Sequence, residues 1–71
     1  MVVFFEKEGR FVRCEARHVA ASDTWELVIV EPDGTERSEQ FRSAAELDAR
    51  VQEIDREYLG CGWFGPYGQR A

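Results

Sequence analysis

Side chains able to carry out catalysis are few in this sequence, and its single imidazole is His18. A hydrolytic triad needs a nucleophile, a base and an orienting group held together. Cys14 and His18 share one face of an expected strand, yet four residues at ~3.3 Å each separate their Cα atoms by about 13 Å, too far for direct proton transfer. Cys61 meets His18 only if the fold brings them together, and a histidine at a strand end is more often a surface residue. We therefore predict no catalytic residue and no enzymatic activity.

A metal or cofactor site is not signalled either. Zinc would need about four ligands from Cys14, Cys61, His18 and a carboxylate, which lack the paired spacing of zinc sites. The glycines of residues 60–65 match a dinucleotide-binding fingerprint by letter, but they follow an expected helix instead of linking a strand to one. We expect no metal, no cofactor and two free thiols, with a disulfide between the cysteines as the alternative.

The remaining candidates for a functional site are aromatic. Residues 62–68 combine three aromatic side chains with glycines and a proline, a composition that signals no regular element. Large apolar rings are seldom left in water, so this aromatic tail is expected to cover the core or to form a protein interface. The predicted interaction residues are Trp63, Phe64, Tyr67 and Trp25. Stacking on the bases of a single-stranded nucleic acid is the alternative use of such rings.

The charge of the chain argues against a nucleic-acid partner. Its 71 residues carry 14 acidic and 9 basic side chains, a formal net charge of -5, and the basic residues are scattered. A phosphate backbone would meet net repulsion. The apolar start at residues 1–5 is followed at once by charged residues, unlike a signal peptide, and no stretch is long enough to cross a membrane. We expect a cytoplasmic protein without a membrane partner.

Four segments have the alternation or apolar content of β-strands. Gly9, which can take a positive φ, suits a tight hairpin between the first two. The third is apolar on both faces, which is typical of a central strand. Residues 32–34 are a Pro-Asp-Gly turn signal, and the polar segment after them is expected to be an edge strand or, alternatively, a loop. The expected strands are Val2–Glu6, Phe11–His18, Thr24–Val30 and Thr35–Phe41.

The hydrophobic period changes to that of a helix over residues 42–59. Ser43 and Glu46 fit a capping box just ahead of an apolar stripe at steps of three and four residues. Glu46 and Arg50 are expected to pair on the solvent side at i and i+4. The stripe comprises Ala44, Leu47, Val51, Ile54 and Tyr58.

The sequence therefore predicts an α+β fold in one domain over residues 1–71. The sheet is a three- to four-stranded antiparallel meander with one C-terminal helix packed on one face, in the order β-β-β-β-α, followed by the aromatic tail. Because one helix covers only one face of a sheet whose centre is apolar on both, the tail or a second copy must cover the other. We predict a homodimer or another protein partner and a non-catalytic interaction or regulatory role. A nucleic-acid-binding module is the alternative function, and a small enzyme or enzyme accessory subunit is the third.

The stretch from Trp25 onward resembles small bacterial α+β proteins of unknown function in its turn, its helix and its Gly62-Trp63 exit. This resemblance implies a fold but no activity. Phe41 and Ser43 at the start of the helix, with the Gly-aromatic exit, are also similar to the end of WGR domains of DNA-repair proteins. The Trp-Gly-Arg motif that names that family is missing from this chain, and the likeness implies nucleic-acid binding only by analogy.

Overall fold

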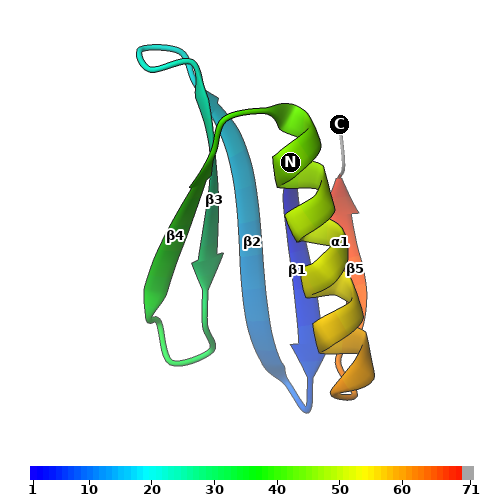
Figure 1. The fold of residues 1–71 in the computed structure, drawn as a ribbon. Coiled ribbons are helices and arrows are strands. Elements are labelled where there is room, and N and C mark those ends of the chain that lie inside the picture. The colour runs from blue at the N-terminus through cyan, green and yellow to red at the C-terminus, as the bar shows by residue number, and fades with distance from the viewer. Residues whose placement is uncertain (70–71) are drawn as a thin grey trace.

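In the computed structural model, which describes residues 1–69, five strands form one antiparallel sheet and a single helix lies across it (Figure 1). The order of the strands in the sheet is β4-β3-β2-β1-β5. The predicted α+β class, the antiparallel meander and the helix on one face are all confirmed. In chain order the elements are β1 (Val2–Lys7), β2 (Arg10–Val19), β3 (Thr24–Val30), β4 (Glu36–Phe41), α1 (Ala44–Gly60) and β5 (Phe64–Gln69).

Short turns set the register of the meander. Lys7 pairs with Arg10 across the first hairpin, where Glu8 and Gly9 both have positive φ. Between β3 and β4, the side chain of Asp33 accepts a hydrogen bond from the backbone N–H of Thr35 at 2.9 Å. This bond holds the pKa of Asp33 below its ordinary value. These local signals explain why the order of the first four strands follows from the sequence.

The helix begins at the predicted capping box. The Ser43 hydroxyl accepts from the backbone N–H of Glu46 at 3.2 Å, and the Glu46 carboxylate accepts from the backbone N–H of Arg42 at 3.1 Å. The first bond satisfies an N–H group that the first turn of a helix leaves without an intrahelical partner. The second reaches Arg42, one residue before the N-cap, whereas in a standard capping box the Glu46 carboxylate accepts from the N–H of the N-cap residue itself. The buried residues of α1 are Leu47, Val51 and Ile54, all members of the predicted stripe.

Replacing Ser43 with alanine is expected to lower the free energy of unfolding by about 1 kcal/mol, because it removes the N-cap acceptor. Urea denaturation followed by far-UV circular dichroism measures this change. Ser38→Ala, at an exposed serine on β4, is the matched control and should be nearly neutral. An unchanged midpoint for Ser43→Ala would show that the cap does not stabilise the helix.

The core lies between α1 and the face of the sheet that it covers. Phe5 is fully buried on β1 and stacks on Tyr58 of the helix, with 5.0 Å between the ring centroids. Burial raises the pKa of the Tyr58 phenol. The buried apolar side chains are Val3, Phe5, Val12, Cys14, Leu27, Ile29, Leu47, Val51 and Ile54.

The aromatic tail is a fifth strand, an element that its composition did not signal. β5 pairs antiparallel with β1, with Tyr67 opposite Phe4 and Gly68 opposite Val3. Gly68 has φ +117°, and a Cβ at this position would collide with the carbonyl oxygen of Val2. Glycine therefore permits the close approach of β5 to β1. Pro66 is tolerated because this strand lies at the edge of the sheet, where one row of N–H groups needs no ladder partner.

Candidate interaction surface

The face of the sheet opposite α1 carries the exposed aromatic side chains of the fold. Phe4 of β1, Phe11 of β2 and Phe64 and Tyr67 of β5 are 37%, 57%, 62% and 55% exposed. In the register, Phe4 pairs with Tyr67, and Glu6 pairs with both Phe11 and Phe64, so all these side chains point to the same face. We call this side of the sheet the open face, and its rings come from three adjacent strands (Figure 1).

Charged side chains continue the open face over β2, β3 and β4. Arg13 pairs with Glu15 at 2.7 Å, and the Arg17 Nε donates to Glu26 at 2.9 Å. The Glu6 carboxylate accepts from the backbone N–H of Gly9 at 2.9 Å. Among residues 1–69, no lysine or arginine forms an ion pair with Glu6. The arginines of the open face are therefore matched by glutamates within the chain, whereas Glu6, set between two rings, has no such cation.

The structure separates the predicted interaction residues into two groups. Phe64 and Tyr67 lie on the open face, whereas Trp25 and Trp63 lie on the helix side and are half-buried. Trp63 packs edge-on against Tyr58, with 5.5 Å between the ring centroids. Trp25 stacks at a tilt on His18, 4.9 Å away. The two tryptophans therefore extend the core, and only two of the four predicted residues belong to the open face.

Phe4 and Phe11, which the sequence reading did not select as interaction residues, complete the aromatic cluster. Phe11 begins the alternation in which Arg13, Glu15 and Arg17 follow on the same face. That charged pattern was a signal that this face is turned away from the helix. Phe4 could be assigned to the same face only once the register between β1 and β2 was known.

Trp25 also lines a cavity of about 530 Å³ between the start of α1 and strands β2 and β3. The small side chains of Ala16 and Ala44 leave this space, and Asp48 is the one carboxylate at its wall. Its volume is within the range of ligand pockets, and its walls are mainly apolar. The lining residues are Met1, Ala16, Trp25, Ala44, Leu47, Asp48 and Val51.

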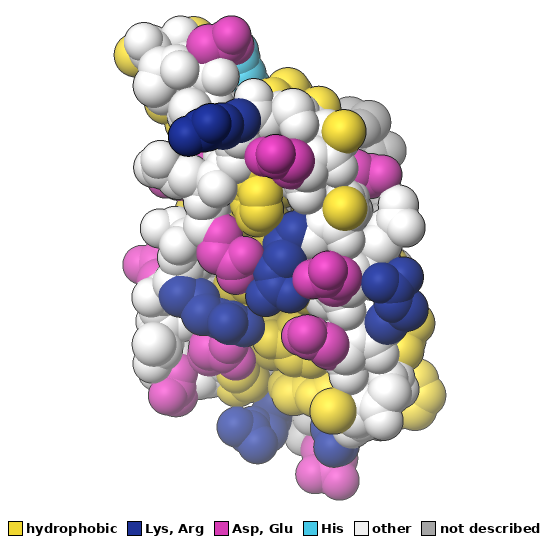
Figure 2. Space-filling view, viewed as in Figure 1, with side chains coloured by type: hydrophobic (Ala, Val, Ile, Leu, Met, Phe, Trp, Pro, Cys, Tyr) yellow, Lys and Arg dark blue, Asp and Glu magenta, His cyan; other side chains and the backbone are white. Residues whose placement is uncertain are grey.

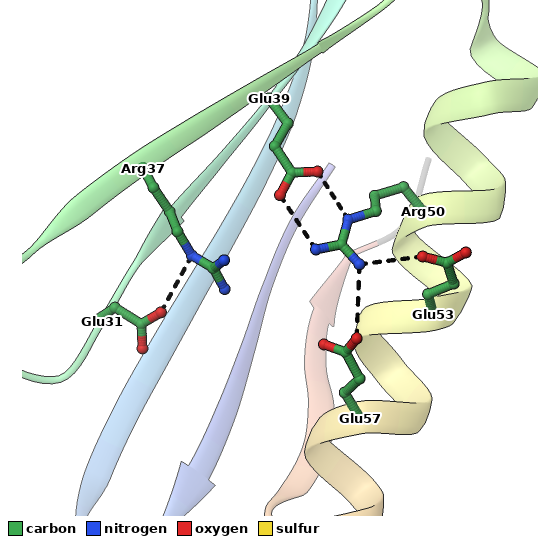
Figure 3. A network of polar contacts seen from close by, with 6 residues as sticks. All are labelled: Glu31, Arg37, Glu39, Arg50, Glu53 and Glu57. Atoms are coloured by element: carbon green, nitrogen blue, oxygen red, sulfur yellow. Dashed lines mark hydrogen bonds and ion pairs between the residues drawn. The ribbon is translucent and has the colours of Figure 1, made fainter.

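On the helix side, Arg50 ties α1 to β4 (Figure 3). Its guanidinium donates to both carboxylate oxygens of Glu39, at 2.8 and 3.3 Å, and also contacts Glu53 and Glu57. These hydrogen bonds hold the pKa of Glu39 below its ordinary value. The expected pair with Glu46 is replaced, because Glu46 is engaged at the helix cap. Seen from this side, acidic and basic side chains are interspersed over the surface (Figure 2).

The groups considered for catalysis lie apart. Cys14 is buried in the core, Cys61 is exposed at the end of α1, and no disulfide joins them. His18 bonds Asp23 at 2.9 Å in the β2–β3 hairpin. In the part of the chain that the structure describes, no three histidine, cysteine, aspartate or glutamate side chains gather in a way that could hold a metal ion. Nor is any described helix both long and apolar enough to cross a membrane.

A scan against protein-family models, a search of curated proteins and a search of solved structures each returned no match. Function is therefore argued from the geometry of the chain itself. Its most distinctive feature is the open face, where exposed rings adjoin a neutral array of paired charges.

Proposed function

We propose that this chain is a small non-catalytic interaction module that self-associates as a homodimer across its open face. The observation that carries the proposal is the cluster of exposed aromatic side chains, Phe4, Phe11, Phe64 and Tyr67, on three neighbouring strands. Contiguous exposed apolar surface of this kind marks interaction sites in small proteins. Aromatic side chains are also enriched at the centres of protein interfaces.

The two edge strands of the sheet are poorly suited to pairing with another chain, which favours association through the open face. The β4 edge carries the charged residues Glu36, Arg37 and Glu39. The β5 edge contains Pro66 between Gly65 and Gly68, both with positive φ. Charged side chains, proline and irregular backbone are the features that block edge-to-edge pairing.

A second copy can cover the aromatic cluster. The molecule measures 38 × 22 × 18 Å, and the rings to be covered lie on three adjacent strands of its sheet. The module is proposed for a reducing compartment such as the cytoplasm, where cysteines that are not joined by a disulfide, as Cys14 and Cys61 are not, are the rule.

Rings on adjacent strands are also the arrangement that stacks nucleic-acid bases, which makes a nucleic-acid-binding module the second candidate function. Phosphate recognition would need cations at the rim of the cluster. On the open face the arginines already pair with Glu15 and Glu26, and the chain carries a net charge of -5. These charges favour a protein partner over a nucleic acid.

Light scattering coupled to size exclusion tests the proposal. At micromolar concentration the wild-type chain is expected to have twice the single-chain mass of 8.2 kDa. Phe11→Ser should weaken the dimer by roughly tenfold or more while leaving the fold intact, since Phe11 is 57% exposed. The matched control is Leu59→Ser, which removes an apolar side chain of 49% exposure at the end of the helix and should leave the dimer unchanged.

Two results would contradict the proposal. One is a single-chain mass for the wild type at micromolar concentration. The other is salt-dependent binding of an oligodeoxythymidine or oligouridine that Phe11→Ser abolishes, which would establish the second candidate function instead.

A further inference from the structure

We infer that the two copies meet about a two-fold axis running diagonally across the open face along Phe4 and Phe11, which sets Glu6 of each copy against Arg13 of the other. This inference rests on the proposed function and specifies the contact by which the same face associates. It makes Glu6 and Arg13 the residues that determine the orientation of the dimer.

The strand register places Phe4 and Phe11 on a diagonal. Tyr67 and Phe4 are cross-strand partners in one row of the open face. Phe11, the partner of Glu6, lies in the next row on β2. Phe4 and Phe11 therefore lie on a diagonal across β1 and β2, and Tyr67 lies beside Phe4 on β5. Rings that lie on a two-fold axis meet their own counterparts, so the apolar cluster of one copy covers that of the other.

Glu6 and Arg13 lie on opposite sides of this diagonal. Glu6 is two residues from Phe4 along β1, and Arg13 is the cross-strand partner of Phe4 on β2. Diagonal neighbours of this kind are about 8 Å apart. A two-fold axis in the plane between two facing sheets exchanges the two sides of the diagonal. Glu6 of one copy therefore faces Arg13 of the other, twice per dimer, and the strands of the two sheets cross steeply, as in orthogonal packing.

The charges of the open face support this pairing. Glu6 lies between Phe11 and Phe64 and has no cation partner among the described residues of its own chain. Among residues 1–69, Arg13 pairs only with Glu15, in an exposed ion pair in which its side chain is 46% exposed. Exposed ion pairs contribute little to stability, so Arg13 can turn to the partner copy at little cost. Arginine is also the cation best suited to lie against aromatic rings.

Arg17, the other arginine of the open face, is less suited to pair with Glu6 of the partner copy. It lies four residues beyond Arg13 on β2, about 13 Å farther from Glu6 along the strand direction. An axis midway between Glu6 and Arg17 would pass between Phe4 and Val2. The rings would then face Val2 and Glu15 instead of one another. The geometry therefore singles out Arg13.

Exchange of charges between two variants tests the pairing. Arg13→Glu and Glu6→Arg, each alone, should raise the dissociation constant of the homodimer at least tenfold, because each sets like charges face to face. An equimolar mixture of the two should form a heterodimer of near wild-type affinity, measured by sedimentation equilibrium. Arg17→Glu makes the same change of net charge on the same face, and its mixture with Glu6→Arg is the matched control that should not recover affinity.

The outcomes separate this inference from the proposed function. Suppose that the wild-type chain dimerises, and that Glu6→Arg recovers affinity when mixed with Arg17→Glu but not when mixed with Arg13→Glu. This result would overturn the diagonal axis and leave self-association valid. A wild-type chain that stays monomeric would remove both. Circular dichroism checks that each variant folds.

Neutral variants give a second measurement that does not depend on charge reversal. Glu6→Gln keeps an oxygen that can accept from the N–H of Gly9. The effects of Glu6→Gln and Arg13→Gln on the dissociation constant should be markedly non-additive if the two side chains contact each other across the dimer. Full additivity would contradict the pairing.

Discussion

Replacing Gly68 with alanine is expected to release β5 from the sheet and to lower the free energy of unfolding by about 2–4 kcal/mol. Gly68 has φ +117°, which L-residues rarely adopt, and an added Cβ would collide with the carbonyl oxygen of Val2. Because the obstacle is backbone of the neighbouring strand, no side-chain rotation relieves it. The released strand carries Phe64 and Tyr67, so the same substitution should also weaken association.

Urea denaturation and light scattering measure the two effects of Gly68→Ala. Gly60→Ala is the matched control, since Gly60 lies at the end of α1 and a Cβ there meets nothing within 4 Å. That variant should be neutral or slightly stabilised, because alanine is the better helix former. Equal denaturation midpoints for the two variants would show that the close approach of β5 to β1 does not depend on glycine.

The largest loss of stability is expected for Phe5→Ala. Phe5 is fully buried and stacks on Tyr58, and truncating a buried phenylalanine costs about 3–5 kcal/mol. Native domains of this size are stable by about 0.05–0.15 kcal/mol per residue, so this one change should remove most of the stability of the 71-residue chain. Thermal denaturation followed by circular dichroism measures it.

Phe11→Ala provides the comparison for Phe5→Ala. Both phenylalanines stand on the first hairpin, but Phe11 is on the open face. Its truncation should change the stability of the monomer by less than about 1 kcal/mol, because most of the ring is already in contact with water. A comparable loss for the two variants would mean that the open face is as important to the fold as the core.

Local signals account for the part of the fold that could be predicted from the sequence. The hairpin at Gly9, the turn at residues 32–34 and the cap at Ser43 are each specified by side chains within a few residues of one another. The strands and the helix that these turns and this cap delimit follow from hydrophobic periods, which agree with the local signals.

The features that could not be predicted depend on residues far apart in the chain. β5 forms because β1 offers an edge, and its glycines and proline look like a loop until that neighbour is known. Arg50 reaches Glu39 across the gap between α1 and β4, a pairing that helix spacing does not reveal. Trp25 and Trp63 were grouped with Phe64 by composition, although the helix separates them by covering only one face.

The pairing of β1 with β5 also affects how the chain folds during its synthesis. Val2 lies opposite Gln69, so β1 leaves the ribosome well before the strand that becomes its outer neighbour. Until then the nascent meander exposes the backbone of β1 as an unprotected edge, where strands of other chains can add. Closing the sheet between its first and last strands is also the most non-local event in the fold, and such contacts slow folding. The interval before β5 docks is therefore when newly made copies of this protein are most open to mispairing.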